Sequence, residues 1–203
     1  MSIGENKQQD GKNIKLRLYV VRHGESETNL AKRWTGWMDV SLTGKGREDA
    51  KKAGDFLKNI EFDRVLSSDL RRAVQTAETA LPGCVPETSP LFREIDLGSL
   101  AGQPLADLTA EQRARNAVLG YVDFGGESKE QFRGRVRQAM EKLETLDCET
   151  AAVFTHGGWM RGLLDEVVGT YLPRKNIRCN NCAVAIFEVE NGLWQLYSWI
   201  NLT

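Results

Sequence analysis

The 203-residue sequence has no large excess of charge of one sign, no long apolar run and no sign of a secretory signal near its start. Its 27 basic and 28 acidic residues almost balance, so no charge excess favours binding to nucleic acid or another polyanion. No apolar run approaches the ~20 residues that cross a membrane. Residues 1–13 are polar and contain no apolar region of a secretory signal. We therefore expect a cytoplasmic protein that binds neither nucleic acid nor membrane, with residues 1–13 forming a mobile N-terminal tail.

Cysteine and histidine are also scarce, with 4 and 2 residues respectively. A zinc site would need all four thiols, because both histidines are better used elsewhere, and the spacing offers a single Cys-x-x-Cys pair. The carboxylates do not cluster at the spacing of metal ligands. We therefore expect no metal, no cofactor and reduced cysteines, which are Cys84, Cys148, Cys179 and Cys182.

Short apolar runs alternate with helical patterns along most of the chain. The runs predict strands over residues 14–21, 62–66, 84–88, 151–155, 182–189 and 193–200. Helices are predicted after Thr43, over 70–81, after Ser128 and over 159–168. Asn191-Gly192 is a strong hairpin signal between the last two strands. The pattern predicts an α/β fold, a three-layer α/β/α sandwich with a mainly parallel sheet and an antiparallel edge.

Two segments are less regular than the rest of the predicted domain, which spans residues 14–203. Residues 29–40 are predicted to form a structured loop beside the end of the first strand. We expect its two tryptophans, Trp34 and Trp37, either to pack beneath the loop or to line the mouth of a site. Residues 99–126 hold a helical stretch from Leu105 to about Val118. We expect this second segment to be a small insertion that covers the active face.

Both histidines directly follow predicted strands. His23 follows Arg22 at the end of the first strand, and His156 follows the strand over 151–155. Such a histidine by itself is often only structural. Because α/β proteins place reactive side chains at the carboxyl ends of strands, two histidines that each follow a strand indicate one site built from distant segments.

A pair of arginines supports this interpretation. Ser67-Ser68-Asp69 is predicted to leave the second strand and cap the next helix, which places Arg71 and Arg72 in its first turn. Arginines near a helix N-terminus are unfavourable for the helix dipole unless an anion lies nearby. Two arginines, two histidines and a helix terminus would suit an anion, above all phosphate.

Four segments, taken together, resemble the histidine phosphatase superfamily, the phosphoglycerate mutase-like proteins. Leu18–Glu25 carries the Arg-His-Gly signature of that family. The supporting segments follow in the family's order over the chain from residue 14 to about 165. They are Ser67–Ala73, Arg93-Glu94 and Thr155-His156-Gly157.

The resemblance implies five catalytic residues. His23 would be the nucleophile that forms a phosphohistidine, and its attack needs a neutral imidazole, which nearby arginine charge favours by lowering its pKa. A backbone carbonyl at the turn would fix the tautomer. Arg22, Arg72 and His156 would hold the phosphoryl oxygens. Glu94 would protonate the departing oxygen and then activate water.

Several neighbouring residues are weaker candidates for these roles. Arg71 and Arg72 diverge by about 100° on a helix, and the family pattern favours Arg72, which leaves Arg71 on the surface. Glu25 is more typical of a turn residue. Asp96 and Glu127 read as solvent-facing or locally hydrogen-bonded carboxylates.

Residues 29–37 resemble the substrate loop of the mutases in this family. The resemblance implies that Asn29, Thr35 and Gly36 contact the substrate. We expect Gly157, which follows His156, to contact the substrate as well. Three features depart from a mutase. They are Leu97 in place of a tyrosine, Gly158 in place of an asparagine, and a shorter span from Glu94 to His156 that shields an intermediate poorly from water. In this span the paired arginines with which mutases hold a second phosphate group or carboxylate are not recognisable, although Arg113 and Arg115 could be remote replacements.

We therefore expect a metal-independent phosphomonoesterase that acts on a small phosphorylated metabolite, most similar to small bacterial phosphatases such as α-ribazole phosphatase. The alternatives are a mutase or sugar bisphosphatase of the same fold, and a non-catalytic protein that binds phosphorylated ligands. The terminal hairpin, which carries Trp194, Tyr197 and Trp199, would either pair across a homodimer or cap the sheet edge.

Overall fold

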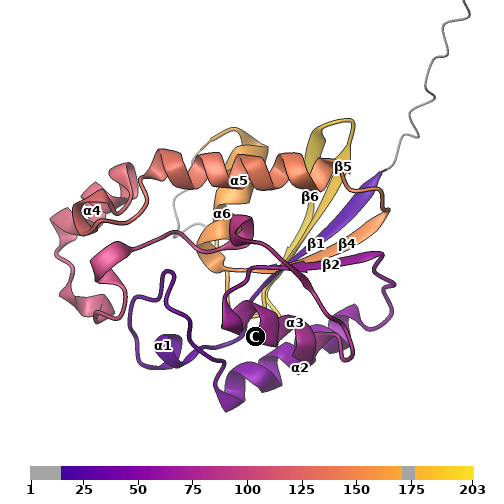
Figure 1. The fold of residues 1–203 in the computed structure, drawn as a ribbon, viewed down its shortest axis with the longest axis horizontal. Helices are drawn as coiled ribbons and strands as arrows, with labels where there is room; N and C mark the ends of the chain where they lie inside the picture. The colour runs from indigo at the N-terminus through magenta and orange to yellow at the C-terminus, as the bar shows by residue number, and fades with distance from the viewer. Residues whose placement is uncertain (1–14, 171–176) are drawn as a thin grey trace, which may run out of the picture.

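Six strands form one sheet in the order β3-β2-β4-β1-β5-β6 in the computed structural model, which describes residues 15–170 and 177–203 (Figure 1). The predicted tail over 1–13 and the predicted strand start at Ile14 lie outside the described residues. The strands are β1 (Leu16–Arg22), β2 (Arg64–Ser67), β3 (Glu87–Thr88), β4 (Thr150–Thr155), β5 (Val184–Glu190) and β6 (Leu193–Ile200).

The sheet is mainly parallel, as predicted. β1, β2, β3 and β4 run parallel to one another, whereas β5 pairs antiparallel with both β1 and β6. The two antiparallel strands form one edge through a hairpin whose turn residues, Asn191 and Gly192, have φ of 53° and 74°. Positive φ at both turn residues is typical of a type I′ turn, which fits the twist of the strands. Pairing of β6 with a second copy stays a prediction.

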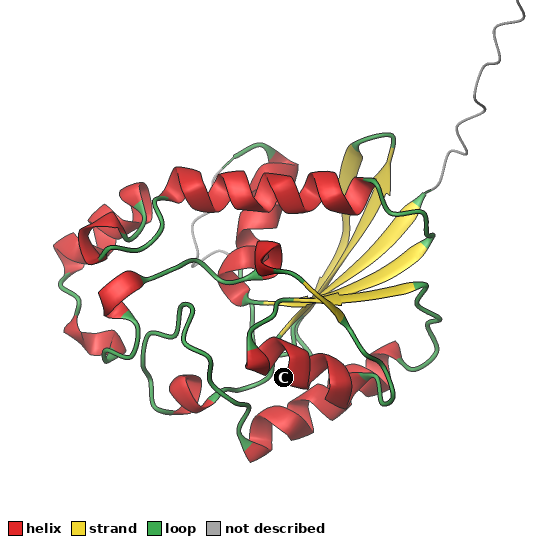
Figure 2. Cartoon of the chain, viewed as in Figure 1, coloured by secondary structure: helices red, strands yellow, loops and turns green. Residues whose placement is uncertain are grey.

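Helices cover both faces of this sheet (Figure 2). The residues of β1 and β4 alternate between two cores, so Val20 and Val153 face α5 and α6, whereas Val21 and Phe154 face α2 and α3. This gives the predicted three-layer sandwich. The α-helices are α1 (Glu27–Leu30), α2 (Gly44–Leu57), α3 (Arg71–Ala80), α4 (Ala110–Leu119), α5 (Lys129–Glu144) and α6 (Gly157–Val168). Short 3₁₀ turns are η1 (Pro90–Phe92), η2 (Gly98–Leu100), η3 (Leu105–Asp107) and η4 (Val122–Phe124).

Local signals explain where two of the main helices begin. The Thr43 hydroxyl accepts from the Gly46 amide and caps α2. Ser128 and Gln131 form the predicted capping box at α5, and Phe132 and Leu143 from its apolar stripe are buried.

The predicted cap of α3 is wrong. The N-cap is Leu70, without a side-chain hydrogen bond, and the Arg71 amide donates instead to Oδ1 of Asp39 at 2.7 Å. The predicted capping residues have other partners, because Asp69 accepts from Arg93 at 2.7 Å and Ser68 contacts His156 at 2.9 Å. Tertiary partners therefore replace the local cap.

Other predicted boundaries shift. The expected helix from Leu105 to about Val118 is broken, because Thr109 and Gln112 form a capping box that starts α4 anew after η3. The loop over 29–40 begins inside the short helix α1, and α6 begins two residues before Trp159. The third strand contains only residues 87 and 88. Across 15–170 and 177–203, none of the helices is both long and apolar enough to span a membrane.

The loop that leaves β1 touches the start of α2 so closely that only glycine fits. A Cβ on Gly46 would lie 2.1 Å from the carbonyl oxygen of Glu25, and a Cβ on Gly24 would lie 2.3 Å from that of Gly46. Both obstacles are backbone atoms, which cannot swing away. This contact fixes the loop that carries His23 against α2.

We predict that Gly46→Ala lowers the free energy of unfolding by about 1–3 kcal/mol, the usual cost of overpacking a core. Gly44→Ala, two residues earlier in the same helix, is the matched control, because a Cβ there meets nothing within 4 Å. This control should be neutral or stabilise by up to ~1 kcal/mol, since alanine favours helix. Urea denaturation of both variants checks this, and equal effects would contradict the close contact.

Candidate active site

The carboxyl ends of three neighbouring parallel strands place the predicted residues together. β1 and β4 pair with Arg22 opposite Thr155, so the residues that follow, His23 and His156, emerge side by side. The His23 amide donates to the Thr155 carbonyl at 2.9 Å, and the two imidazole centroids lie 5.2 Å apart. β2 pairs with the other side of β4 and delivers Ser68 to the same edge.

His23 is buried and held in one orientation. Its Nδ1 lies 2.7 Å from the Gly24 carbonyl oxygen, so Nδ1 carries the proton and Nε2 keeps its lone pair. The Nε–H of Arg72 points at Nε2 from 3.3 Å. Burial, and then the charges of Arg72 and Arg22, hold the pKa of His23 well below its usual range. The imidazole is therefore neutral at neutral pH, as the chemistry of a nucleophile requires.

Arg72 is fully buried, and no carboxylate of the described residues forms an ion pair with it. Its guanidinium donates to the carbonyl oxygens of Gly36 and Met38, both at 2.8 Å, and to His23. Burial lowers its pKa to about 10, which leaves it charged at neutral pH. By contrast, Arg71 is exposed and pairs with Asp39, so the preference for Arg72 agrees with the structure.

Two buried nitrogens beside His23 lack a partner among the described residues. They are Nε of Arg22 and Nδ1 of His156. The other groups of these side chains are held, since Arg22 Nη1 donates to the Cys179 carbonyl and His156 Nε2 contacts the Ser68 hydroxyl. Buried polar atoms are normally hydrogen-bonded, so the unpaired Nε of Arg22, a residue of the cavity wall, indicates that a ligand belongs there.

Glu94 reaches the same cavity from the segment after η1. Its Oε1 accepts from the Ile95 amide at 2.9 Å, and its Oε2 accepts from the Gly158 amide at 2.8 Å. A Cβ on Gly158 would lie 2.0 Å from Oε1, so this carboxylate position requires glycine at 158. The position of the Glu94 carboxylate therefore gives a steric reason for glycine at position 158, where mutases have asparagine.

The predicted substrate-binding residues also line the cavity, which has a volume of about 250 Å³. Asn29 and Thr35 come from the loop after β1, and Gly157 opens α6. Gly36, with φ of 51°, turns its carbonyl to Arg72 and packs on Leu97, which stands where mutases carry tyrosine. His156 itself lies behind this wall, fully buried, so its contact with a phosphoryl oxygen stays a prediction.

The structure adds wall residues that the sequence analysis missed. Asn181 donates to the His23 carbonyl at 3.0 Å and to Oδ1 of Asn29 at 3.2 Å, and no sequence signal marked it. Arg33 and Arg161 add two cations. Arg33 lies within residues 29–37, which resemble the substrate loop of the mutases, and Arg161 lies one helical turn after Gly157. The apolar part of the wall consists of Trp34, Ile95, Leu97, Leu105 and Tyr121.

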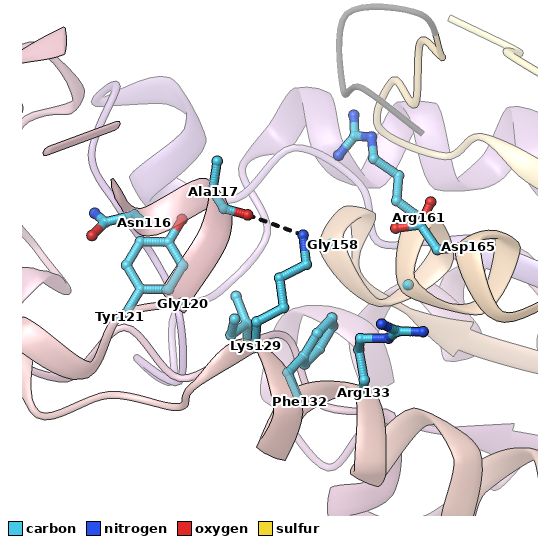
Figure 3. Close-up of a pocket in the computed structure, with 12 residues that line it drawn as sticks. Asn116, Ala117, Gly120, Tyr121, Lys129, Phe132, Arg133, Gly158, Arg161 and Asp165 are labelled. Carbon is cyan, nitrogen blue, oxygen red and sulfur yellow. Dashed lines mark hydrogen bonds between the residues drawn. The ribbon is translucent and has the colours of Figure 1, made fainter. Parts of the chain in front are cut away.

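A second, smaller cavity of about 50 Å³ adjoins the first between α4, α5 and α6 (Figure 3). The two share four wall residues, Ile95, Tyr121, Gly158 and Arg161. Lys129 extends across this space to donate to the Ala117 carbonyl at 3.1 Å. The predicted insertion over 99–126 thus contributes wall residues to both cavities.

The remaining candidates have structural partners. Oε1 of Glu25 accepts from the Thr43 hydroxyl at 2.8 Å, and Asp96 accepts from the Gly98 amide at 3.0 Å. Glu127 is bound by Arg135, which agrees with a local hydrogen-bonding role. Arg113 and Arg115, which could have replaced the paired arginines of mutases, hold loop carbonyls and Asp123 instead. Within the described residues, histidine, cysteine and carboxylates form no group of three that could hold a metal, and all four cysteines are unpaired thiols.

Comparison with known proteins agrees with this geometry. A family model described as the histidine phosphatase superfamily, branch 1, matches residues 18–202. A protein of Proteus mirabilis named "probable phosphoglycerate mutase" is 31% identical over 195 residues, which cover 91% of this chain and 90% of that protein. The solved structure of a mycobacterial glucosyl-3-phosphoglycerate phosphatase is 26% identical, with a TM-score of 0.76 over 91% of this chain and 98% of that one.

The fold has a further match in a mutant phosphoserine phosphatase from Entamoeba histolytica, solved in complex with phosphoserine. It superposes with a TM-score of 0.81 over 93% of this chain and 98% of that one, at 22% identity. At this identity the likeness concerns the fold alone.

The two buried histidines predict how stability depends on pH. Burial and then the charge of Arg72 lower both pKa values well below their usual range. Below the unfolded pKa of ~6.5 the unfolded chain binds protons that the folded chain does not, so acid favours unfolding. We predict that the free energy of unfolding falls between pH 7 and the lowered folded pKa values, by up to about 1.4 kcal/mol per pH unit for each histidine.

Urea denaturation at pH 7.0 and at pH 5.5 measures this loss. The chain has only 2 histidines, so the double variant His23→Asn, His156→Asn should lose most of the pH dependence in this window. An unchanged dependence in the double variant would show that other groups cause it.

Proposed function

The chain belongs to the histidine phosphatase superfamily, as its motifs predicted, and we propose that it hydrolyses a small phosphomonoester through a phosphohistidine on His23. One observation carries this proposal. A neutral imidazole, with its Nε2 lone pair free of a proton, lies in a cavity wall that also contains Arg22, Arg72 and the Glu94 carboxyl group. Such a set of groups suits phosphoryl transfer to nitrogen without a metal.

In the first step, Nε2 of His23 attacks phosphorus and the bond from phosphorus to the ester oxygen breaks. Glu94 in its protonated form gives its proton to the departing oxygen, which leaves as an alcohol. In the second step, Glu94 as a carboxylate takes a proton from water while the water oxygen attacks phosphorus. Inorganic phosphate leaves, and His23 returns to its neutral form.

The transferred group carries negative charge throughout, and the site supplies two arginines that form no direct ion pair with a carboxylate of the described residues. Nε of Arg22 is unpaired among the described residues, and Arg72 is bound only to neutral acceptors. The N-terminus of the twelve-residue helix α6 adds its dipole, since Gly157 and Gly158 lie in the cavity wall. These groups favour the charged transition state.

The cavity wall supports a small substrate with both apolar and anionic character. A volume of about 250 Å³ suits a small metabolite, at the lower end of ordinary ligand sites. Apolar side chains form one part of the wall, and Arg33 and Arg161 add charge elsewhere.

A phosphoglycerate mutase is the second candidate, because the Proteus mirabilis relative carries that name. A mutase must hold its phosphohistidine until the substrate is rephosphorylated, and it therefore excludes water. Against a mutase, Arg113 and Arg115 are bound to other partners and are not among the wall residues of the cavity. We therefore favour hydrolysis.

We predict steady turnover of p-nitrophenyl phosphate that EDTA leaves unchanged and that His23→Ala abolishes, since no other group replaces the nucleophile. Alkaline quenching with labelled substrate should trap up to one phosphoryl group per chain in the wild type, because the nitrogen–phosphorus bond of a phosphohistidine survives in base and hydrolyses in acid. Phosphoglycerate interconversion that needs a bisphosphoglycerate primer would favour the mutase, and binding without turnover would favour a non-catalytic protein.

The adjacent arginines give a matched pair of variants. We predict that Arg72→Ala lowers kcat/KM by about 10²–10³-fold, the usual loss when one stabilising donor is removed from a transition state. Arg71→Ala removes the same charge from the exposed position and should change kcat/KM by less than about 2-fold. Comparable losses in both variants would mean that long-range charge, and not contact with the phosphoryl group, explains the effect.

A further inference from the structure

The backbone around Glu94 is held by side chains that the catalytic scheme does not use. Nε1 of Trp37 donates to the Glu94 carbonyl oxygen at 2.6 Å, and Nη2 of Arg135 donates to the same oxygen at 2.9 Å. Trp37 comes from the loop after α1, whereas Arg135 comes from the middle of α5. Two distant segments therefore meet on one carbonyl group.

All three guanidinium nitrogens of Arg135 donate hydrogen bonds to this segment or to Glu127. Its Nη1 donates to the carbonyls of Arg93 at 2.6 Å and Leu91 at 3.3 Å. Its Nε and Nη2 form a fork on the Glu127 carboxylate, at 2.9 and 2.7 Å. Both side chains are largely buried, with 12% and 15% exposed. A buried fork of this kind fixes geometry, because each N–H has one direction.

The Glu127 carboxylate holds the backbone on the other side of Glu94. We call the contacts of Arg135 and Glu127 with this backbone the clamp on Glu94. Oε2 of Glu127 also accepts from the Asp96 amide at 2.8 Å. The ion pair therefore holds the backbone at 93 and 94 through Arg135, and at 96 through Glu127. Glu94 and Ile95, whose amide binds the catalytic carboxylate, lie between these anchors.

We infer that Arg135 is a positioning residue for the proton-transfer group Glu94. This inference rests on the function proposed above. The segment from 91 to 96 contains η1 and no strand, so no sheet ladder fixes the Glu94 carbonyl. Without Arg135, the Glu94 carboxylate loses the backbone orientation that brings it to the Gly158 amide, and Glu127 becomes a buried charge without this partner. Misplacement by ~1 Å is enough to cost ~10²-fold in a catalysed step.

The dependence on the leaving group separates positioning from general structural damage. An alkyl phosphate such as β-glycerophosphate releases a poor leaving group that needs a proton from Glu94. p-Nitrophenyl phosphate releases a phenolate that leaves without one. Because kcat/KM covers only the steps up to loss of the leaving group, a misplaced Glu94 should affect the first substrate far more than the second.

For Arg135→Met, which keeps an unbranched apolar stem, we expect kcat/KM for β-glycerophosphate to fall at least ~10-fold more than for p-nitrophenyl phosphate. Trp37→Phe removes one donor to the same carbonyl but keeps an aromatic ring, and should give a smaller loss with the same selectivity. Arg137→Met is the matched control on α5, since Arg137 pairs with Glu166 on the surface, and both kcat/KM values should stay within ~2-fold.

Equal losses on the two substrates, or no loss, in Arg135→Met and Trp37→Phe would overturn the inference. If Arg135→Met does not fold, Trp37→Phe alone decides. Equal losses on the two substrates in Trp37→Phe would then overturn the inference. Failure of the proposed function is distinct, because the wild type would then hydrolyse neither substrate and trap no phosphoryl group. Glu94→Gln, measured beside these variants, gives the full selectivity expected from losing the proton donor.

Discussion

The parallel pairing of β1 with β4 is the constraint on which the site depends. Residues 23 and 156 are 133 positions apart, but the register of Arg22 with Thr155 places their imidazoles at a centroid distance of 5.2 Å. A shift of one residue would turn one histidine to the opposite face of the sheet. The register is in turn specified by the two cores, because alternate residues of both strands are buried against different helices.

The electrostatics of the site follow from what surrounds Arg72. A buried cation usually has a carboxylate partner, which cancels its field. Here the guanidinium donates to two carbonyl oxygens and to the His23 lone pair, all of them neutral acceptors, so its charge can act on an anion in the cavity. The same charge, after burial, lowers the pKa of both histidines. One arrangement therefore keeps His23 neutral and, under the proposed function, would attract the phosphoryl group.

Most of the layered fold and the central residues could be predicted from the sequence, because their signals are local. The apolar runs, the capping box at Ser128 and the turn at Asn191 each lie within a few residues of the structure that they specify. The candidate site residues came from the resemblance of four short segments to one family. What failed depends on long-range partners, as when Asp39 replaces the local cap of α3. Asn181 and the clamp on Glu94 were missed for the same reason, since neither has a local pattern.

The departures from a mutase sequence have physical consequences in the cavity. Gly158 leaves room for the Glu94 carboxylate, whose Oε1 would lie 2.0 Å from a Cβ at that position. A larger residue there must either displace this carboxylate or hold it elsewhere. Leu97 packs against Gly36 and replaces a hydroxyl that could bind a polar substrate group. Relative to the mutase pattern, both changes remove side chains that could contact a substrate, while His23, the arginines and Glu94 remain. Under the hydrolytic function proposed above, this combination would favour release of the first product and attack by water over transfer back to a retained substrate.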